Sequence, residues 1–263
     1  VALAPILSRA GVRRSLLATL IKRGRISAAP AFSFQDGMER LPQAMAEALG
    51  DRVRLGAPVE LISATRSGWV ATVGDTGERI KAEQIVMATP ALAAATLLEH
   101  QAPRASATIR ALNHNPIAIV HVTADLDADA MGFQVAFAES HRALRGVTFQ
   151  HCLFNRHRLF SAFLGGSLNP AIVDADDALL ANTATKEFED TTGAPAEAIS
   201  VWRTQMPAWD LSWRALKDLR MPVGLHVAGN WHTRAGLPGR FAEAKSVTAS
   251  VLGLSTQSPD EQL

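Results

Sequence analysis

Tyrosine is absent from this 263-residue chain, cysteine occurs only once, and no long uncharged hydrophobic run is present. The single cysteine, Cys152, excludes an internal disulfide framework and fits a reducing compartment such as the cytoplasm. Because a membrane-spanning helix needs about 18 or more consecutive apolar residues, none is expected. The net charge of +1 gives no basic field that would attract nucleic acid, so we expect no nucleic-acid partner.

The sequence also lacks the common motifs of catalysis by side chains. It contains no G-x-S-x-G elbow, no G-x-x-x-x-G-K-[ST] loop, no H-E-x-x-H motif and no G-x-G-x-x-G dinucleotide-binding turn. His151 and His157 do not have the spacing of zinc ligands, and we expect no metal site. No catalytic side chain is predicted, so any chemistry would come from a bound cofactor.

The residues that are present predict a folded protein of mixed helix and strand. Hydrophobic residues make up 48% of the chain, enough to bury a sizeable core. Apolar runs bounded by turn residues predict strands over residues 53–55, 59–66, 69–73, 78–81, 84–88, 117–123, 146–154, 158–164, 199–205 and 225–228. Helices are predicted near Pro42 and over residues 90–100, 174–191 and 237–252. The pattern indicates an α/β or α+β fold with mixed sheets.

The first 28 residues carry six basic side chains and no acidic one. Apolar residues recur there at helical spacing, which predicts a basic amphipathic helix. One interpretation is a helix that contacts an anionic surface, such as the inner face of the cytoplasmic membrane. The other is a helix that packs on its own domain and exposes its basic face to solvent.

The end of the chain has a strand, a glycine turn and a helix start in succession. An apolar run is followed by Gly229 and Asn230, and Gly236, Leu237 and Pro238 then open a predicted helix. The N-terminus of a helix presents unpaired backbone N–H groups and the positive end of the helix dipole. This arrangement predicts a site for an electron-rich edge of a ligand.

Five segments of the chain carry patterns that occur together in one family. They are FSFQDGMERLP at 32–42; GAPV at 56–59 with IVMATP at 85–90; GF at 132–133 with LRGV at 144–147, LF at 153–154 and FLGG at 163–166; WR at 202–203 with MPAW at 206–209; and the stretch 229–253. In this order they resemble the C-terminal half of oxygen-dependent protoporphyrinogen oxidases, members of the flavin-containing amine oxidase superfamily. The resemblance implies the C-terminal portion of an FAD-linked fold, with a mixed sheet in the substrate domain.

The resemblance also implies an activity and a set of contacts. The enzyme would oxidise protoporphyrinogen to protoporphyrin in haem biosynthesis, with FAD as cofactor and oxygen as electron acceptor. The FAD-contacting positions implied are Val59, Ala88, Thr89, Pro90, Gly229, Asn230, Gly236, Leu237 and Pro238. Phe133 and Phe154 would contact the tetrapyrrole substrate. Each position also has an ordinary interpretation, as a strand valine, a strand-to-helix turn or a core phenylalanine.

The family divides the chain into four expected parts. These are residues 1–29, a remnant of a membrane-facing helical subdomain; 30–100, part of the FAD domain with a β-meander; 101–222, the substrate-domain sheet and helices; and 223–263, the FAD-contacting strand–turn–helix and tail. The family's N-terminal dinucleotide-binding unit is not in this sequence. An unpaired strand edge there permits association with a second polypeptide, for example as a homodimer.

Two other hypotheses stay open at this point. One is a different oxidase or desaturase of the same superfamily, distinguished by its substrate. The other is a non-catalytic fragment that binds a tetrapyrrole without binding flavin.

Overall fold

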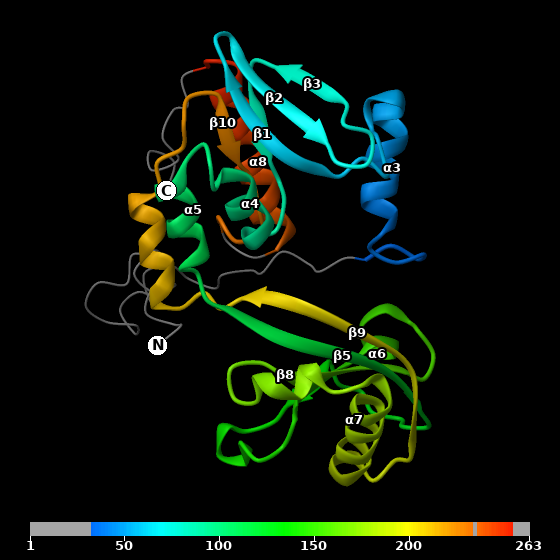
Figure 1. Cartoon of the computed structure of the whole chain (residues 1–263). Helices are drawn as coiled ribbons and strands as arrows, with labels where there is room; N and C mark the ends of the chain where they lie inside the picture. The colour runs from blue at the N-terminus through cyan, green and yellow to red at the C-terminus, as the bar shows by residue number, and fades with distance from the viewer. Residues whose placement is uncertain (1–32, 234–235, 255–263) are drawn as a thin grey trace, which may run out of the picture. The chain divides into compact units, whose positions relative to one another are not determined.

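The structure is a computed structural model that describes residues 33–233 and 236–254, and these form two compact units (Figure 1). The first unit contains residues 49–113 and 209–254, and the second contains residues 33–48 and 114–208. The unit boundaries therefore lie after Asn113 and Ala208. The divisions expected from the sequence were at residues 100 and 222. The basic helix expected over residues 1–28 lies outside the described residues.

The first unit contains an antiparallel meander and a parallel pair of strands. The meander has the order β1-β2-β3, and the parallel pair joins β4 to β10. The strands are β1 (Val59–Thr65), β2 (Gly68–Val73), β3 (Arg79–Ala82), β4 (Ile85–Met87) and β10 (Leu225–Val227). Residues 74–77 form the connection between β2 and β3.

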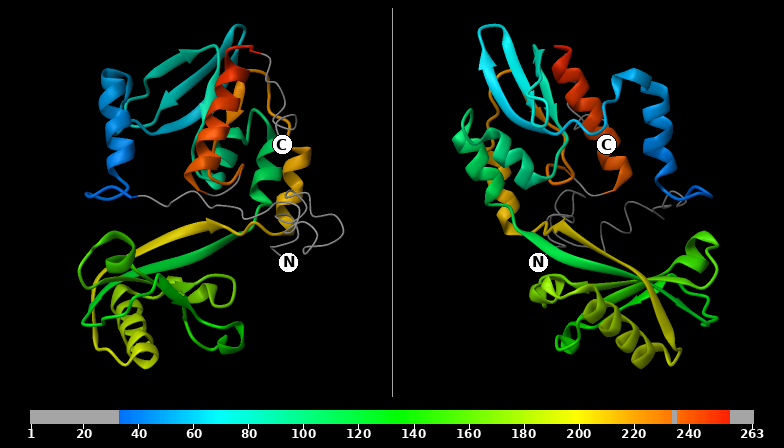
Figure 2. Two further views of the ribbon diagram at one scale, coloured as in Figure 1. Left: turned by 180° about the vertical axis from the view of Figure 1, so that it is seen from behind. Right: turned by 45° about the vertical axis from the view of Figure 1, so that its right-hand side comes forward.

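Helices complete the core of the first unit. They are the 3-10 helices η1 (Gly50–Arg52) and η4 (Leu211–Asp218) and the α-helices α4 (Ala91–Leu98), α5 (Pro103–Arg110) and α8 (Leu237–Val251). Ala94, Ala95 and Leu98 of α4 are fully buried, in one cluster with Ile109 of α5 and with Trp231. Helix α8 contacts β10, and the view from behind brings α8 to the front of this unit (Figure 2). The sequence did not predict α5 or η4.

The second unit is built on an antiparallel sheet of five strands in the order β6-β7-β8-β5-β9. The strands are β5 (His114–Ala124), β6 (Gly132–Gln134), β7 (Leu144–Phe149), β8 (Leu159–Gly165) and β9 (Ala196–Pro207). Its helices are α6 (Gln150–Phe154), α7 (Asp177–Thr192), η2 (Phe137–Glu139) and η3 (Pro170–Asp174), and α3 (Arg40–Leu49) ends where the first unit begins.

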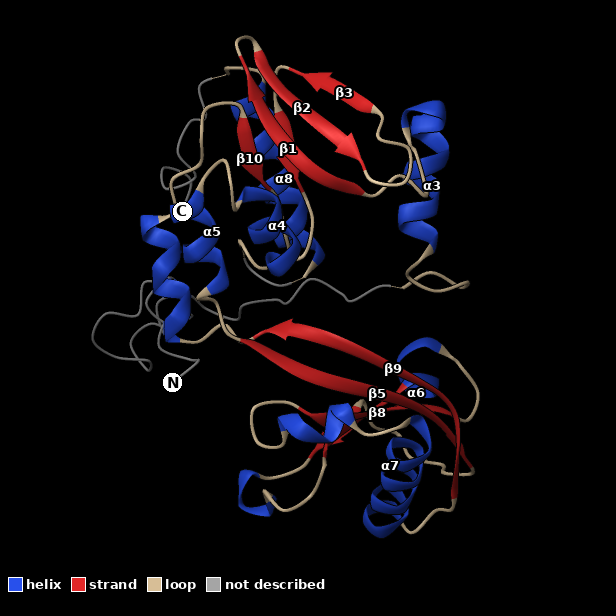
Figure 3. Cartoon of the chain, viewed as in Figure 1, coloured by secondary structure: helices blue, strands red, loops and turns tan. Residues whose placement is uncertain are grey.

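Helix α7 covers one face of this sheet (Figure 3). The Asp176 carboxylate begins the helix by accepting a hydrogen bond of 2.7 Å from the Leu179 N–H. Gly193 ends it with a φ of 75°, a left-handed conformation that suits glycine. Leu180 and Phe188 are fully buried against alternate residues of the strands, so α7 and the sheet form the core of the unit.

Two sequence predictions of strands are wrong. Residues 53–55 form no strand, because Gly56 turns the chain at a φ of 64° directly after them and Leu55 is 89% exposed. Residues 146–154 do not form one strand either. The strand β7 ends at Phe149, and the turn of helix α6 follows because Asn155 N–H bonds back to the carbonyl of His151 at 2.9 Å.

A carboxylate fixes the start of η4 at the boundary of the first unit. Asp210 Oδ2 accepts a hydrogen bond of 2.8 Å from Asn113 Nδ2, and Asp210 Oδ1 accepts one of 2.8 Å from the Ser212 N–H. These hydrogen bonds, with that from Asn113 the larger cause, hold the pKa of Asp210 below its usual value. Asp210 thus stabilises the fold in its ionised form.

The stability that Asp210 provides should depend on pH. We expect Asp210→Ala to lower the free energy of unfolding at pH 7 by about 1 kcal/mol, as loss of a helix cap does. Because the folded-state pKa of Asp210 lies below the unfolded value, the contribution is complete above about pH 4 and is lost as the pH falls through the folded pKa. Urea unfolding of both proteins at pH 7 and at lower pH measures this. A difference that stays constant over the range contradicts the assignment.

Candidate functional site

The two turns singled out in the sequence lie at the same edge of the parallel strand pair. Met87 of β4 pairs with Val227 of β10, so the carboxyl ends of both strands meet. Ala88, Thr89 and Pro90 follow β4 and lead into α4, and the segment from Gly229 follows β10 and leads towards α8. Crevices at the carboxyl ends of parallel strands are the usual ligand sites of open sheets.

A buried tryptophan joins these two turns. Trp231 is fully buried, and its indole N–H donates a hydrogen bond of 3.0 Å to the carbonyl of Thr89, 142 residues away in the sequence. A Cβ at Gly229 would lie 2.2 Å from Trp231 Nε1, so the indole requires glycine at this position. Gly229, which the sequence predicted to contact a ligand, is therefore required for packing against Trp231. Trp231 was not among the residues predicted from the sequence, although it directly follows Asn230.

The start of α8 is exposed and has no side-chain cap among the described residues. Gly236 has a φ of 92°, and a Cβ there would meet nothing closer than Pro238 Cδ at 3.9 Å. Gly236 and Pro238 are exposed, as are Asn230, Ala88 and Pro90 on the neighbouring turns. These positions leave room at the helix N-terminus for a ligand that accepts hydrogen bonds.

A buried ionic cluster holds the second turn against α8. The Glu243 side chain is 3% exposed, and its carboxylate lies 2.8 Å from His232 Nδ1 and 2.9 Å from Arg240 Nη1. Arg240 also donates hydrogen bonds to the carbonyl of Gly229 and the hydroxyl of Thr233. The cluster therefore positions the turn relative to the first two turns of α8. Only the i, i+3 spacing of Arg240 and Glu243 signals it in the sequence.

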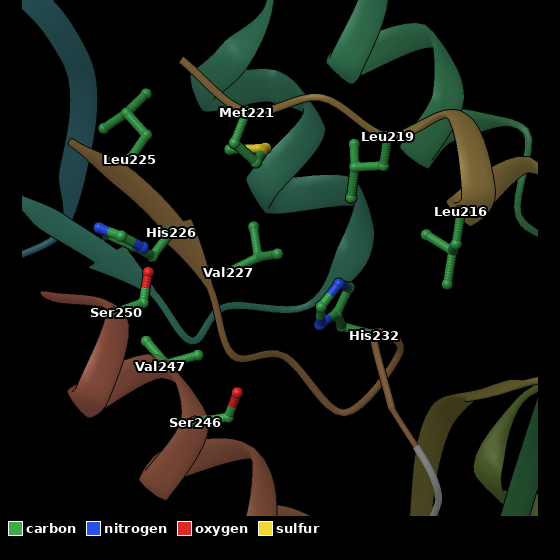
Figure 4. Close-up of a pocket in the computed structure, with 10 residues that line it drawn as sticks. All are labelled: Leu216, Leu219, Met221, Leu225, His226, Val227, His232, Ser246, Val247 and Ser250. Carbon is green, nitrogen blue, oxygen red and sulfur yellow. The ribbon is translucent and has the colours of Figure 1, made fainter. Parts of the chain in front are cut away.

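A groove flanks the site on the side of β10 (Figure 4). It has a volume of about 270 Å³, and its lining side chains come from β10 and the turn after it, from α8, and from η4 and the segment that follows η4. His232 lines the groove, and His226 of β10 forms a hydrogen bond of 2.7 Å with Gln84 Oε1. The groove is largely apolar at Leu219 and Met221 and was not predicted from the sequence.

The other predicted contact residues lie elsewhere. Val59 is the first residue of β1, in the meander, and is 41% exposed. Phe133 and Phe154 belong to the second unit. Phe133 packs against the core that α7 covers, with its ring 6.1 Å from that of Phe149, whereas Phe154 ends α6 and is 37% exposed. Within the first unit the structure thus brings the two turns together, while Val59 belongs to the meander.

No group of three or more His, Cys, Asp or Glu side chains in the described part of the chain could hold a metal ion. None of the helices in residues 33–233 and 236–254 is long and apolar enough to cross a membrane.

Residues 4–250 match the family described as flavin containing amine oxidoreductases. The chain belongs to this family. A curated relative, chloroplastic protoporphyrinogen oxidase 1 of Spinacia oleracea, is 22% identical over 260 residues, which cover 87% of this chain and 46% of the relative. The amine oxidoreductase family therefore accounts for nearly the whole chain, while the chain spans about half the length of the curated relative.

Solved structures of the family share the fold. A proposed protoporphyrinogen oxidase from Exiguobacterium sp. 255-15 has a TM-score of 0.74 at 20% identity, with 93% of this chain and 56% of that chain covered. A putrescine oxidase variant with redesigned cofactor binding has a TM-score of 0.63 at 17% identity, with 83% and 53% covered. The fold class predicted from the sequence, mixed helix and sheet of the amine-oxidase type, is confirmed.

The family implies a flavin, and the residues of the first unit fit one. Thr89 Oγ1 is buried and has no hydrogen-bond partner among the described residues, at the turn where a ligand edge would lie. The exposed, uncapped start of α8 lies on the neighbouring turn. The carbonyl oxygens and ring nitrogens of a flavin would pair with the Thr89 hydroxyl and with the backbone N–H groups at the start of α8.

Proposed function

We propose that the chain carries the flavin-facing turns and the substrate sheet of an FAD-dependent protoporphyrinogen oxidase. The observation that supports this most directly is the meeting of two strand-to-helix turns at the carboxyl ends of β4 and β10, with the start of α8 exposed beside them. FAD would supply the electron acceptor for the reaction when bound. The similarity to the spinach enzyme and to the Exiguobacterium structure supports protoporphyrinogen as the substrate.

The residues of this chain would position the flavin ring and would not themselves react. The backbone N–H groups at the start of α8 would donate to oxygens of the flavin ring, and the partial positive charge of the helix would stabilise negative charge that develops there. Thr89 Oγ1 would donate or accept at the opposite turn. The Glu243 cluster would keep the two turns at a fixed separation. Each pair of electrons and protons removed from the macrocycle would reduce one O₂ to hydrogen peroxide.

A second candidate is oxidation of a diamine, because putrescine oxidase structures share the fold. A diamine is a cation and would need acidic side chains near it. The partly exposed face of the five-stranded sheet instead presents Ile117, Ile119, Phe163 and Trp202. This apolar face favours a large ring system over a small cation.

The function is tested with the full 263-residue chain, FAD and protoporphyrinogen under air. Fluorescence of the product porphyrin is followed, because the porphyrinogen itself does not fluoresce in the visible. We expect FAD-dependent formation of porphyrin above the rate of spontaneous oxidation. A rate equal to that of FAD without protein contradicts the proposal, and FAD-dependent peroxide release with putrescine instead would favour the second candidate.

Gly236 offers a test of the flavin site itself. We expect Gly236→Trp to abolish FAD binding, because the indole would fill the open space at the start of α8. Since any side chain at a φ of 92° is strained, Gly236→Ala is the control that adds the strain without the bulk. Equilibrium dialysis with FAD measures both. Equal FAD binding by the two variants removes this segment from the site.

A further inference from the structure

The five-stranded sheet of the second unit has a buried face and a partly exposed face. Along β5, alternate residues from Ala118 to Ala124 are buried beneath α7, whereas Ile117, Ile119 and His121 between them are only half-buried. The described residues of the second unit therefore leave this face partly exposed.

Strand register places an apolar row beside a polar row on the partly exposed face. Ile119 pairs with Phe163 of β8 on one side and with Trp202 of β9 on the other, and Trp202 is 65% exposed. We call Phe163, Ile119 and Trp202 the apolar row. His121, two residues along β5, lies about 7 Å from Ile119 by strand geometry and pairs with Ser161 of β8. Ser161 is only 3% exposed, so a ligand on this face would meet the apolar row beside the half-buried imidazole of His121.

A cation, Arg156, lies at the polar end of this face. The loop between α6 and β8 holds it in place, because the Arg156 N–H bonds to the Gln150 carbonyl at 3.4 Å and the Leu159 N–H bonds to the Arg156 carbonyl at 3.2 Å. Arg156 Cζ lies 5.7 Å from the centre of the exposed Phe154 ring. A Cβ at the buried Gly37 would lie 3.0 Å from Arg156 Nη2, so this glycine leaves the guanidinium its space.

The charge of Arg156 is not neutralised by its surroundings. Among the described residues Arg156 forms no ion pair. Burial and, second, the charge of Arg156 lower the pKa of His121, so the imidazole is neutral at pH 7. Because His121 is neutral, Arg156 supplies the positive charge at this end of the sheet face.

From this geometry we infer that Arg156 binds a carboxylate of a ligand whose ring system lies on the apolar row. A guanidinium binds carboxylates through paired N–H donors, and its placement over Phe154 puts this charge beside an apolar surface. The inference rests on the proposed function, because a tetrapyrrole with propionate side chains is a ring system that carries such carboxylates. Arg156 is thus a positioning residue that sets the orientation of the macrocycle.

The test compares binding of protoporphyrin and of its dimethyl ester to the full chain, without flavin, by porphyrin fluorescence anisotropy. Arg156→Gln is expected to weaken binding of the free acid roughly tenfold, as loss of a charge-assisted hydrogen bond does, and to leave binding of the ester unchanged. Arg156→Lys is expected to retain part of the affinity for the acid. Arg158→Gln is the matched control, since it removes an exposed charge two residues away in the same loop, and it should change neither affinity.

Each other outcome overturns the inference. Equal loss for acid and ester would mean that Arg156 only supports the fold, and no loss for the acid would mean that the carboxylate binds elsewhere. In either case, FAD-dependent porphyrin formation by the wild-type chain would still support the proposed function. Failure of the chain to bind both porphyrins contradicts the inference together with the tetrapyrrole substrate.

Discussion

Trp231→Ala is expected to lower the free energy of unfolding of the first unit by about 3–5 kcal/mol, the range for truncating a buried aromatic side chain. Trp231 is fully buried in the core, and its ring occupies the space that a side chain at position 229 would need. The variant would also lose the hydrogen bond to the Thr89 carbonyl that joins the two turns. We therefore expect weaker FAD binding together with lower stability. Urea unfolding followed by far-ultraviolet circular dichroism measures the first effect, and equilibrium dialysis the second.

Two further variants separate the causes of this effect. Trp231→Phe keeps most of the ring but not the N–H donor, and leaves the Thr89 carbonyl without that partner, so we expect a loss of about 1–2 kcal/mol. Trp202→Ala makes the same change at a tryptophan that is 65% exposed, and should cost less than about 1 kcal/mol. Similar losses for Trp231→Ala and Trp202→Ala would contradict the role of Trp231 as the packed link between the turns.

Glu243→Gln is expected to lower the free energy of unfolding by about 2–3 kcal/mol, because it removes the charge between two basic groups. This loss is at or below the lower end of the range for breaking a buried ion pair, because the Arg240 and His232 side chains are 24% and 33% exposed and keep some contact with water. Loss of the cluster would also free the turn that carries Gly229 and Thr233. FAD binding should fall with it, and the same unfolding and dialysis measurements apply.

An exposed ion pair provides the control for Glu243. Glu99 lies 3.1 Å from Arg110, with side chains 58% and 39% exposed, so Glu99→Gln should cost less than about 1 kcal/mol. Replacing the whole cluster by apolar side chains, as in Glu243→Leu with Arg240→Met, should recover part of the stability but not the hydrogen bond to Gly229. Equal losses in the free energy of unfolding for Glu243→Gln and Glu99→Gln would show that the buried Glu243 cluster stabilises the fold no more than an exposed ion pair does.

The part of the site that the sequence predicted is the part encoded locally. The turns after β4 and β10 each combine an apolar strand, small or glycine residues and a proline at a helix start within one short stretch of sequence, and such local patterns predict the conformation of the segment that carries them. The meander and α7 were predicted for the same reason, and α7 ends before Gly193 as expected. Family resemblance then related these turns to a flavin.

The missed features depend on contacts between distant residues. Trp231 donates a hydrogen bond to the carbonyl of Thr89, 142 residues away in the sequence. The buried carboxylate of Glu243 is paired with His232 from the turn after β10 and with Arg240 from the preceding turn of α8. A charged residue in a helix is more often solvated, so its sequence alone gives no sign of burial. Phe133 was assigned without a strand register, and pairing with Val147 turns it towards the core.

The central claim is that the turns after β4 and β10 hold the flavin ring. Hydrogen–deuterium exchange of the full chain with saturating FAD, and separately with ADP, tests it most directly, because ADP contains the adenine half but not the flavin ring. The account predicts slower exchange at residues 88–91 and 228–240 with FAD and no slowing there with ADP. Unchanged exchange in both segments with FAD would contradict it.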